Sequence, residues 1–204
     1  MRRHLGFLTA AGCALLFSPA AAVANDSVYT DMNLDGCQTV RLEEDISITK
    51  RCIGPAGYPF YVKEGDLRQT VLFGPIKQSY VDQAFETFGS FNHTGAKAEW
   101  RLDGKGRPIA AIVRYILEHS PPDGTAPSEA YHGQVLVISR VAQKRDGLGC
   151  IAGFVDAKAT KDANLLARQV ADEVAPGFRC GVDIPVYYGK RGDSAEDLMT
   201  VLPD

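Results

Sequence analysis

Cys37-Gln-Thr-Val-Arg-Leu-Glu-Glu-Asp-Ile-Ser-Ile-Thr-Lys-Arg-Cys52 contains a β-hairpin pattern between two cysteines. Val40 and Leu42 alternate with polar residues before the acidic segment 43–45, and Ile46 and Ile48 alternate with polar residues after it. Alternation of this kind on both sides of a polar turn is typical of two paired strands. The rest of the fold is expected to extend outward from this hairpin.

The cysteines and the apolar residues of this hairpin imply different registers. Pairing Val40 with Ile48 places Cys37 opposite Arg51 rather than opposite Cys52. One extra residue in one strand shifts the pairing by one position and reconciles the two registers. A bulge is therefore predicted here, together with a Cys37–Cys52 disulfide.

The segment that follows predicts a tight loop and two further strands. Gly54-Pro-Ala-Gly-Tyr-Pro59 cannot form a helix, and its prolines are excluded from a central strand. Residues 58–62 and 67–73 then alternate between apolar and polar positions, with Glu64-Gly65-Asp66 as the turn between them. The loop is thus tethered by Cys52 and leads into a second hairpin.

The remaining chain predicts a mixed but mainly antiparallel fold. Helical spacing of apolar residues predicts helices over 76–88 and 160–174. Strands are expected at 98–102, 109–117, 135–141, 150–155 and 182–188, and the segment 109–117 is apolar at nearly every position, which indicates a central strand. Hairpin-spaced strands with only two helices predict one α+β domain over 25–204, stapled by two disulfides.

The first 24 residues have the features of a secretory signal peptide. Arg2 and Arg3 precede an apolar run, and Ala22-Val-Ala24 is a small-x-small cleavage site. Cys13 follows Ala10-Ala-Gly12, a degraded lipoprotein box, but we favour its interpretation as an apolar residue of the leader. The expected destination is the periplasm or the extracellular space.

Charge and cysteine content agree with export. Without residues 1–24 the chain keeps 20 of its 22 basic residues against 25 acidic ones, a net charge of −5, which argues against nucleic acid as a partner. No second apolar run approaches the length of a membrane span. The four remaining cysteines allow three pairings, of which we favour the nearest neighbours, Cys37–Cys52 and Cys150–Cys180.

The sequence contains none of the common catalytic signatures, such as GxSxG, a P-loop, HExxH or CxxC. Two groupings remain that no motif constrains. Ser90, His93 and Asp103 could form a hydrolytic trio, and His119, His132 and Asp123 could form a metal site. All three histidines fall in predicted loops.

Asp31-Met-Asn-Leu-Asp-Gly36 resembles the start of a calcium loop, but Leu42 occupies the position of the required carboxylate, so an Asx turn is favoured.

The strongest candidate for recognition is the loop that follows Cys52. Aromatic side chains on a disulfide-stiffened loop lose little conformational entropy on binding. The predicted binding residues, which are aromatic or charged and lie on or just after this loop, are Tyr58, Phe60, Tyr61, Glu64, Asp66 and Arg68. In the alternative interpretation, Phe60 and Val62 enter the core and only Tyr58 is exposed. No cofactor and no metal ion is predicted.

The run from Cys52 to Arg68, with Glu99-Trp-Arg-Leu102 and Gly106-Arg-Pro108, resembles small exported proteins of Gram-negative bacteria that have no assigned activity. A fainter similarity is to periplasmic lysozyme inhibitors, which present a Ser-Gly-containing loop ending in Tyr, although Gly54-Pro-Ala-Gly-Tyr58 lacks the Ser. The expected function is that of a non-catalytic, inhibitor-like binding protein whose partner is another protein or a cell-envelope component. The alternative is a periplasmic hydrolase that uses the loop histidines.

Overall fold

The computed structural model describes residues 25–43, 46–121, 123–124 and 128–203. The predicted signal peptide at 1–24, and with it Cys13, lies outside these residues. So does the middle of the acidic turn, Glu44 and Asp45.

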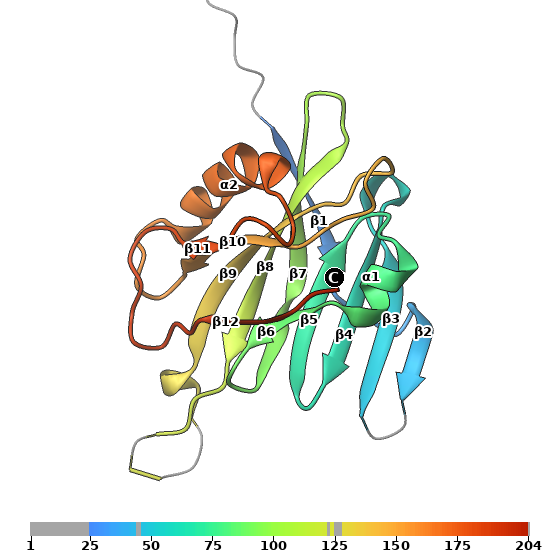
Figure 1. Ribbon diagram of the computed structural model, residues 1–204. Coiled ribbons are helices and arrows are strands. Elements are labelled where there is room, and N and C mark those ends of the chain that lie inside the picture. Colours follow the sequence, from blue (N-terminus) through green and yellow to red (C-terminus); the bar gives the residue numbers. More distant parts are fainter. Residues whose placement is uncertain (1–24, 44–45, 122, 125–127, 204) are drawn as a thin grey trace, which may run out of the picture.

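Two mainly antiparallel sheets form the body of the molecule (Figure 1). In spatial order, the six-stranded sheet consists of β1 (Asp26–Asp31), β7 (Asn92–Leu102), β8 (Pro108–Leu117), β9 (Gly133–Arg140), β10 (Ile151–Asp156) and β11 (Val186–Tyr187). The four-stranded sheet consists of β2 (Gln38–Glu43), β3 (Ser47–Ile53), β4 (Pro59–Gly65) and β5 (Arg68–Phe73). A separate pair joins β6 (Phe85–Phe88) to β12 (Leu198–Val201). All these pairings are antiparallel except that of β10 with β11.

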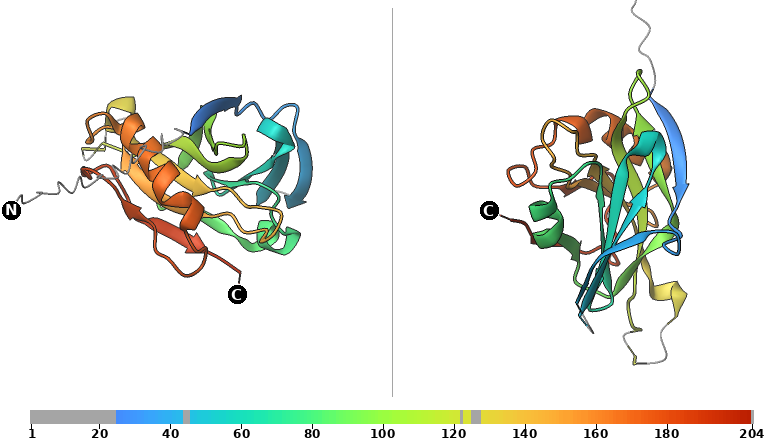
Figure 2. Two further views of the ribbon diagram at one scale, coloured as in Figure 1. Left: turned by 90° about the horizontal axis from the view of Figure 1, so that it is seen from above. Right: turned by 90° about the vertical axis from the view of Figure 1, so that its right-hand side faces the viewer.

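Two α-helices accompany the sheets, so the predicted α+β class is confirmed. They are α1 (Gln78–Gln83) and α2 (Ala163–Glu173), and short 3-10 turns occur at η1 (Pro55–Gly57), η2 (Glu129–Tyr131) and η3 (Ala175–Gly177). The turn between β7 and β8 lies at the opposite end of the molecule from η2 (Figure 2). No helix among the described residues is long and apolar enough to cross a membrane.

The largest apolar cluster joins the two sheets. Trp100 on β7 is fully buried and packs edge-on against Phe73 and Phe60, with ring centroids 5.0 and 6.1 Å away. Side chains alternate along β8, so Ala111 and Val113 join this cluster while their neighbours pack under α2. β8 is therefore the central strand that its apolar composition predicted, covered on both faces.

Each helix covers its own apolar cluster. Small residues of α2, Ala163, Ala167 and Ala171, pack on the face of β8, β9 and β10 that points away from the central cluster. Tyr80 and Val81 of α1 pack with Tyr61 and Leu72 from the outer face of the four-stranded sheet. The helices thus seal surfaces that the sheets alone would expose to water.

Both predicted disulfides are present. Cys37 is bonded to Cys52, and Cys150, the residue before β10, is bonded to Cys180 beyond η3. The predicted bulge is also present, because the register between β2 and β3 shifts by one residue between Thr39 and Arg41. The expected facing of Val40 against Ile48 is wrong in detail, since Ile48 faces Leu42 and Val40 is the extra residue.

Three expected elements differ from those observed. The helix predicted over 76–88 stops at Gln83, and residues 85–88 pair with β12 instead. The strand predicted over 182–188 is confined to Val186–Tyr187. His93 lies in β7 rather than in a loop. Residues 85–88 and His93 lie in strands because each pairs with a segment distant in sequence, which local spacing does not encode, whereas residues 182–183 form a turn on Arg179.

Candidate functional site

Tyr58 is held in place by the turn that precedes it. The Gly54 amide donates a hydrogen bond to the Tyr58 carbonyl oxygen at 2.7 Å and closes the turn around η1. A Cβ atom on Gly54 would lie only 2.5 Å from the Trp100 ring, so the turn packs directly on the buried indole. Gly57 has a φ of +73°, a conformation that favours glycine. The glycine pattern therefore fixes the path of the chain into Tyr58.

The Tyr58 side chain bridges to another loop. Its hydroxyl donates a hydrogen bond to Gln143 Oε1 at 3.2 Å. Gln143 Nε2 in turn donates to the Pro108 carbonyl oxygen at 2.9 Å. The aromatic loop, the start of β8 and the loop 143–149 are thus joined through two side chains, and Tyr58 is only half buried.

A pocket of about 490 Å³ opens beside this bridge. Its lining combines Tyr58 with residues from the β7–β8 turn, the end of β9, the loop 143–149 and η3. The other lining residues are Arg107, Ile109, Arg140, Val141, Gln143, Lys144, Arg145 and Pro176. We call it the Tyr58 pocket. It lies at the end of the molecule where η1 and the loop 143–149 come together (Figure 1).

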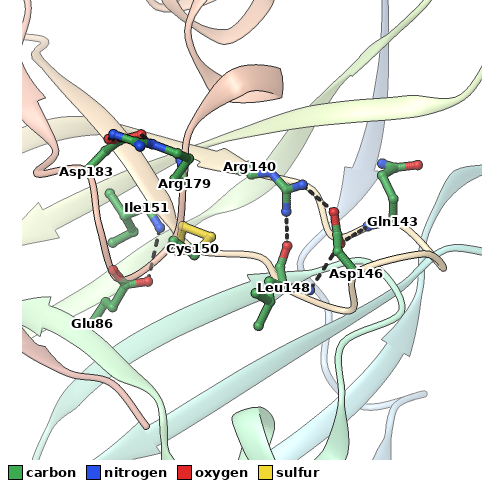
Figure 3. Close-up of a disulfide and its surroundings, with 10 residues drawn as sticks. Glu86, Arg140, Gln143, Asp146, Leu148, Cys150, Ile151, Arg179 and Asp183 are labelled. Atoms are coloured by element: carbon green, nitrogen blue, oxygen red, sulfur yellow. Dashed lines mark hydrogen bonds and ion pairs between the residues drawn. A yellow bond between two sulfur atoms is a disulfide. The ribbon is translucent and has the colours of Figure 1, made fainter. Parts of the chain in front are cut away.

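Asp146 makes the loop 143–149 rigid. Its carboxylate accepts hydrogen bonds from the backbone amides of Gln143 and Leu148, at 3.1 and 3.2 Å, and from the Arg140 guanidinium (Figure 3). Burial alone would raise the pKa of Asp146, but the Arg140 and backbone hydrogen bonds outweigh it and hold the pKa below its usual value. Arg140 also donates to the Leu148 carbonyl oxygen, so one ion pair organises the whole loop.

The electrostatic character of the Tyr58 pocket is basic. Four of the residues that line it are cationic, and none of them is acidic. Arg140 is neutralised by Asp146, and Arg107 pairs with Asp103 at 2.7 Å. Lys144 is exposed and makes no hydrogen bond or ion pair with any other described residue, and Arg145 lies 3.9 Å from Asp146 with 82% of its side chain exposed. The pocket therefore suits an anionic group.

No family model, curated protein or solved structure matched this chain.

The structure separates the six binding residues predicted from the sequence. Tyr58 lines the pocket, whereas Phe60 and Tyr61 are only 1% and 6% exposed. Phe60 stacks on Phe73 with ring centroids 6.2 Å apart, and Tyr61 packs under α1. These two aromatic residues stabilise the core and present no surface to a partner, as in the alternative interpretation of this loop.

Glu64, Asp66 and Arg68 lie at the far end of β4. Six residue steps separate the ends of this strand, roughly 20 Å at about 3.3 Å per residue. Glu64 accepts a hydrogen bond from Gln69 Nε2 at 2.7 Å, and Arg68 donates to the Gly89 carbonyl oxygen at 2.7 and 2.9 Å and pairs with Asp66. Arg68 therefore anchors the turn after β6, and none of the three contributes to the Tyr58 pocket.

The hydrolytic trio considered from the sequence is not assembled. His93 and Asp103 lie at opposite ends of β7, and His93 Nδ1 is 3.0 Å from Glu118 Oε1. A different cluster forms at the end of the molecule away from the Tyr58 pocket, where Ser90 bonds to Glu196. His119 Nε2 lies 3.7 Å from Glu196 Oε1 and is buried without a hydrogen-bond partner among the described residues.

This Ser90–Glu196–His119 order differs from that of an activated serine. In a catalytic triad the imidazole contacts the hydroxyl and removes its proton. Here the carboxylate stands between the two groups and binds the hydroxyl itself.

Within the described residues, no group of three or more His, Cys, Asp and Glu side chains has an arrangement that could hold a metal ion. Asn33 accepts a hydrogen bond from the Asp35 amide at 3.0 Å, as expected for an Asx turn.

Sequence analysis missed most of the pocket. Lys144 and Arg145 are noticeable in the sequence as a basic tip between two strands, but their proximity to Tyr58 depends on contacts between distant segments. Arg107 follows a turn and carries no signal that distinguishes it from other exposed arginines. The pocket could therefore be recognised only once the loops were placed.

Proposed function

We propose that this protein is a non-catalytic binding protein of the periplasm or extracellular space, which recognises an acidic group on another protein or a cell-envelope component through the Tyr58 pocket. One observation carries the proposal: Tyr58, fixed by Gln143, lines a pocket whose charged residues are all cationic. Charge complementarity of this kind speeds association and selects the partner. The two disulfides agree with an oxidising compartment.

Pre-organisation of the pocket supports binding. The aromatic ring is held by a hydrogen bond across 85 residues of sequence, and the loop opposite is held by Asp146. A surface that is already ordered loses little entropy when a partner docks. An inhibitor-like use follows the same chemistry, because the cleft of a glycoside hydrolase contains paired carboxyl groups that cations can approach.

The test uses residues 25–204, oxidised, and two probes that present carboxylates: purified muropeptides and lysozyme. Surface plasmon resonance measures binding, and an inhibition assay is added for lysozyme. Lys144→Gln/Arg145→Gln should weaken saturable binding at least about tenfold, the loss expected from removing charges that contact a partner. Lys161→Gln/Lys190→Gln removes the same net charge from exposed positions outside the pocket and should leave binding unchanged.

Two results would contradict the proposal. One is the absence of saturable binding to both probes, and the other is an equal loss in the pocket variant and its control. A parallel screen for hydrolytic turnover addresses the alternative function. Turnover that disappears with His119→Ala or Ser90→Ala would establish the hydrolase in place of the binding protein.

A further inference from the structure

A buried carboxyl group lies on the side of the second disulfide away from the loop 143–149 (Figure 3). Glu86 is the second residue of β6 and is only 3% exposed. Its Oε2 accepts a hydrogen bond at 3.0 Å from the amide of Ile151, the residue that follows Cys150. In the part of the chain that the structure describes, this is the only hydrogen bond to the Glu86 carboxyl group, and no Lys or Arg pairs with it.

The surroundings of Glu86 disfavour its charge. Burial raises the pKa of Glu86 to about 7, and the Ile151 hydrogen bond opposes the rise. Tyr80 of α1 and Tyr115 of β8 are near enough to be influenced by the same charge, and both have raised pKa values, chiefly through burial. Neither supplies a cation. The charged form of a buried carboxyl group without a positive partner is disfavoured, and a ligand that supplies a cation would relieve that cost.

Glu86 lines a pocket of about 220 Å³ that is separate from the Tyr58 pocket. The rest of the lining comes from the start of β10, the segment 178–185 and β12 with the residue after it. The apolar lining residues are Ile151, Phe178, Val182, Ile184, Pro185 and Leu202. Two of these are unusually accessible for apolar side chains, since Val182 is 64% and Ile184 82% exposed. The pocket thus has a carboxyl group inside and apolar side chains at the surface.

The other charged residue at this pocket is already neutralised. The Asp183 carboxylate accepts one hydrogen bond from Arg179 Nε at 3.0 Å and another from the backbone amide of Arg179 at 2.8 Å. The carboxyl group available to a ligand is therefore that of Glu86. A single carboxylate with apolar walls does not resemble the multi-oxygen shell of a calcium or magnesium site, and its charge opposes an anion.

We propose that this pocket binds a small organic amine, with the ammonium group on the Glu86 carboxylate and the apolar part against Val182 and Ile184. The pairing supplies the missing cation to Glu86 and covers exposed apolar surface, so both contributions favour the complex. The volume is below the roughly 300–1,000 Å³ of pockets for drug-sized molecules, which restricts the ligand to a small one. This inference does not depend on the function proposed for the Tyr58 pocket.

The experiment uses 2-phenylethylammonium as the probe and 2-phenylethanol, which has the same apolar body without the charge, as its control. Nuclear magnetic resonance follows the Ile151 amide of residues 25–204, because its hydrogen bond ends on Glu86. The ammonium probe should give saturable shifts at Ile151. The alcohol should bind at least about tenfold more weakly, because it cannot form the ion pair.

Glu86→Gln tests the carboxylate itself. The amide oxygen can still accept from Ile151, but the charge is lost, and affinity for the ammonium probe should fall at least about tenfold. Glu173→Gln changes an exposed carboxylate on α2 and should bind like the wild type. Wild-type protein provides a measurement that needs no variant: affinity should be about thirtyfold lower at about pH 5.5 than at about pH 8, since Glu86 is protonated at the lower pH while the probe stays charged.

The hydrogen bonds from Arg179 hold the pKa of Asp183 below its usual value, so Asp183 stays charged over this range and does not reproduce the effect. Equal affinity of the two probes would overturn the proposal. So would unchanged affinity between the two pH values, or the absence of a saturable Ile151 shift.

Discussion

Cys37 reaches Cys52 across the β2–β3 hairpin because Val40 is an extra residue in β2. Before the bulge, Gln38 faces Arg51 and Thr39 faces Lys50, and this register continued outward places the two cysteines opposite each other. After the bulge, Leu42 faces Ile48. The bond fixes the start of the segment that turns over Trp100 into Tyr58, so the bulge and the binding loop are mechanically connected.

Removal of this disulfide should destabilise the protein. Cys37→Ala/Cys52→Ala is expected to cost about 3 kcal/mol, the chain-entropy value for a closed loop of about 15 residues. Urea denaturation of oxidised protein measures it. The same variant should weaken muropeptide or lysozyme binding more than Tyr58→Phe does, since the latter loses one hydrogen bond to Gln143. Peptide mapping that joins Cys37 to Cys150 or Cys180 would refute the connection.

Lys63 should stabilise the end of α1. Its ammonium group donates hydrogen bonds to the carbonyl oxygens of Val81 and Ala84 at 2.7 and 2.6 Å, where the helix leaves them unpaired. Lys63→Met keeps the aliphatic stem but leaves buried acceptors unsatisfied, at a cost of about 1–3 kcal/mol. Lys50→Met, which loses a longer bond of 3.3 Å to Leu34, is the control and should cost less in urea denaturation. Equal costs would argue against the capping role.

Glu86 should make stability depend on pH. Its folded-state pKa of about 7 lies above the ordinary 4.5, so between these values the folded protein holds the proton that the unfolded chain has lost. Stability contributed by the neutral acid is complete below about pH 4.5 and declines as pH rises to about 7. Glu86→Gln lacks this loss. Wild type should therefore lose about 3 kcal/mol relative to the variant between about pH 4.5 and 8, at about 1.4 kcal/mol per pKa unit.

Urea midpoints of both proteins at the two pH values measure this difference. Glu173→Gln, on the exposed surface of α2, should follow the wild type. A wild type that gains stability relative to Glu86→Gln as the pH rises would show that the carboxylate is stabilised in the fold, contrary to its burial.

Asp146 should be the residue that keeps the loop 143–149 ordered. Asp146→Asn removes the ion pair with Arg140 and weakens the bonds from the Gln143 and Leu148 amides, for a loss of about 1–3 kcal/mol. Hydrogen exchange at these two amides should accelerate, while Asp193→Asn, at an exposed position, should leave exchange there unchanged. Slow exchange retained in Asp146→Asn would mean that the loop is ordered by other contacts.

Local sequence patterns were sufficient for elements whose burial and pairing follow from their own residues. The alternation around Val40 and the mismatch with the cysteines predicted a bulge, and the continuous apolar run of β8 predicted a central strand. They were insufficient for residues 85–88. Aromatic spacing there fitted a helix, but Ala84 is extended, Lys63 caps the helix, and β12 supplies a strand to pair with.

The sequence by itself determined the α+β class and the turn that leads into Tyr58, because hydrophobic alternation, glycines and prolines act over short distances. It left three disulfide pairings open, and the structure decided for Cys37–Cys52 and Cys150–Cys180. Only the tertiary structure decided that Phe60 and Tyr61 are buried. It also decided that Lys144 and Arg145 line the same pocket as Tyr58, and that Glu86 and Cys150 line a second pocket. Those relationships join segments far apart in the chain. They depend on how the sheets and loops pack, and a local sequence pattern contains no information about that packing.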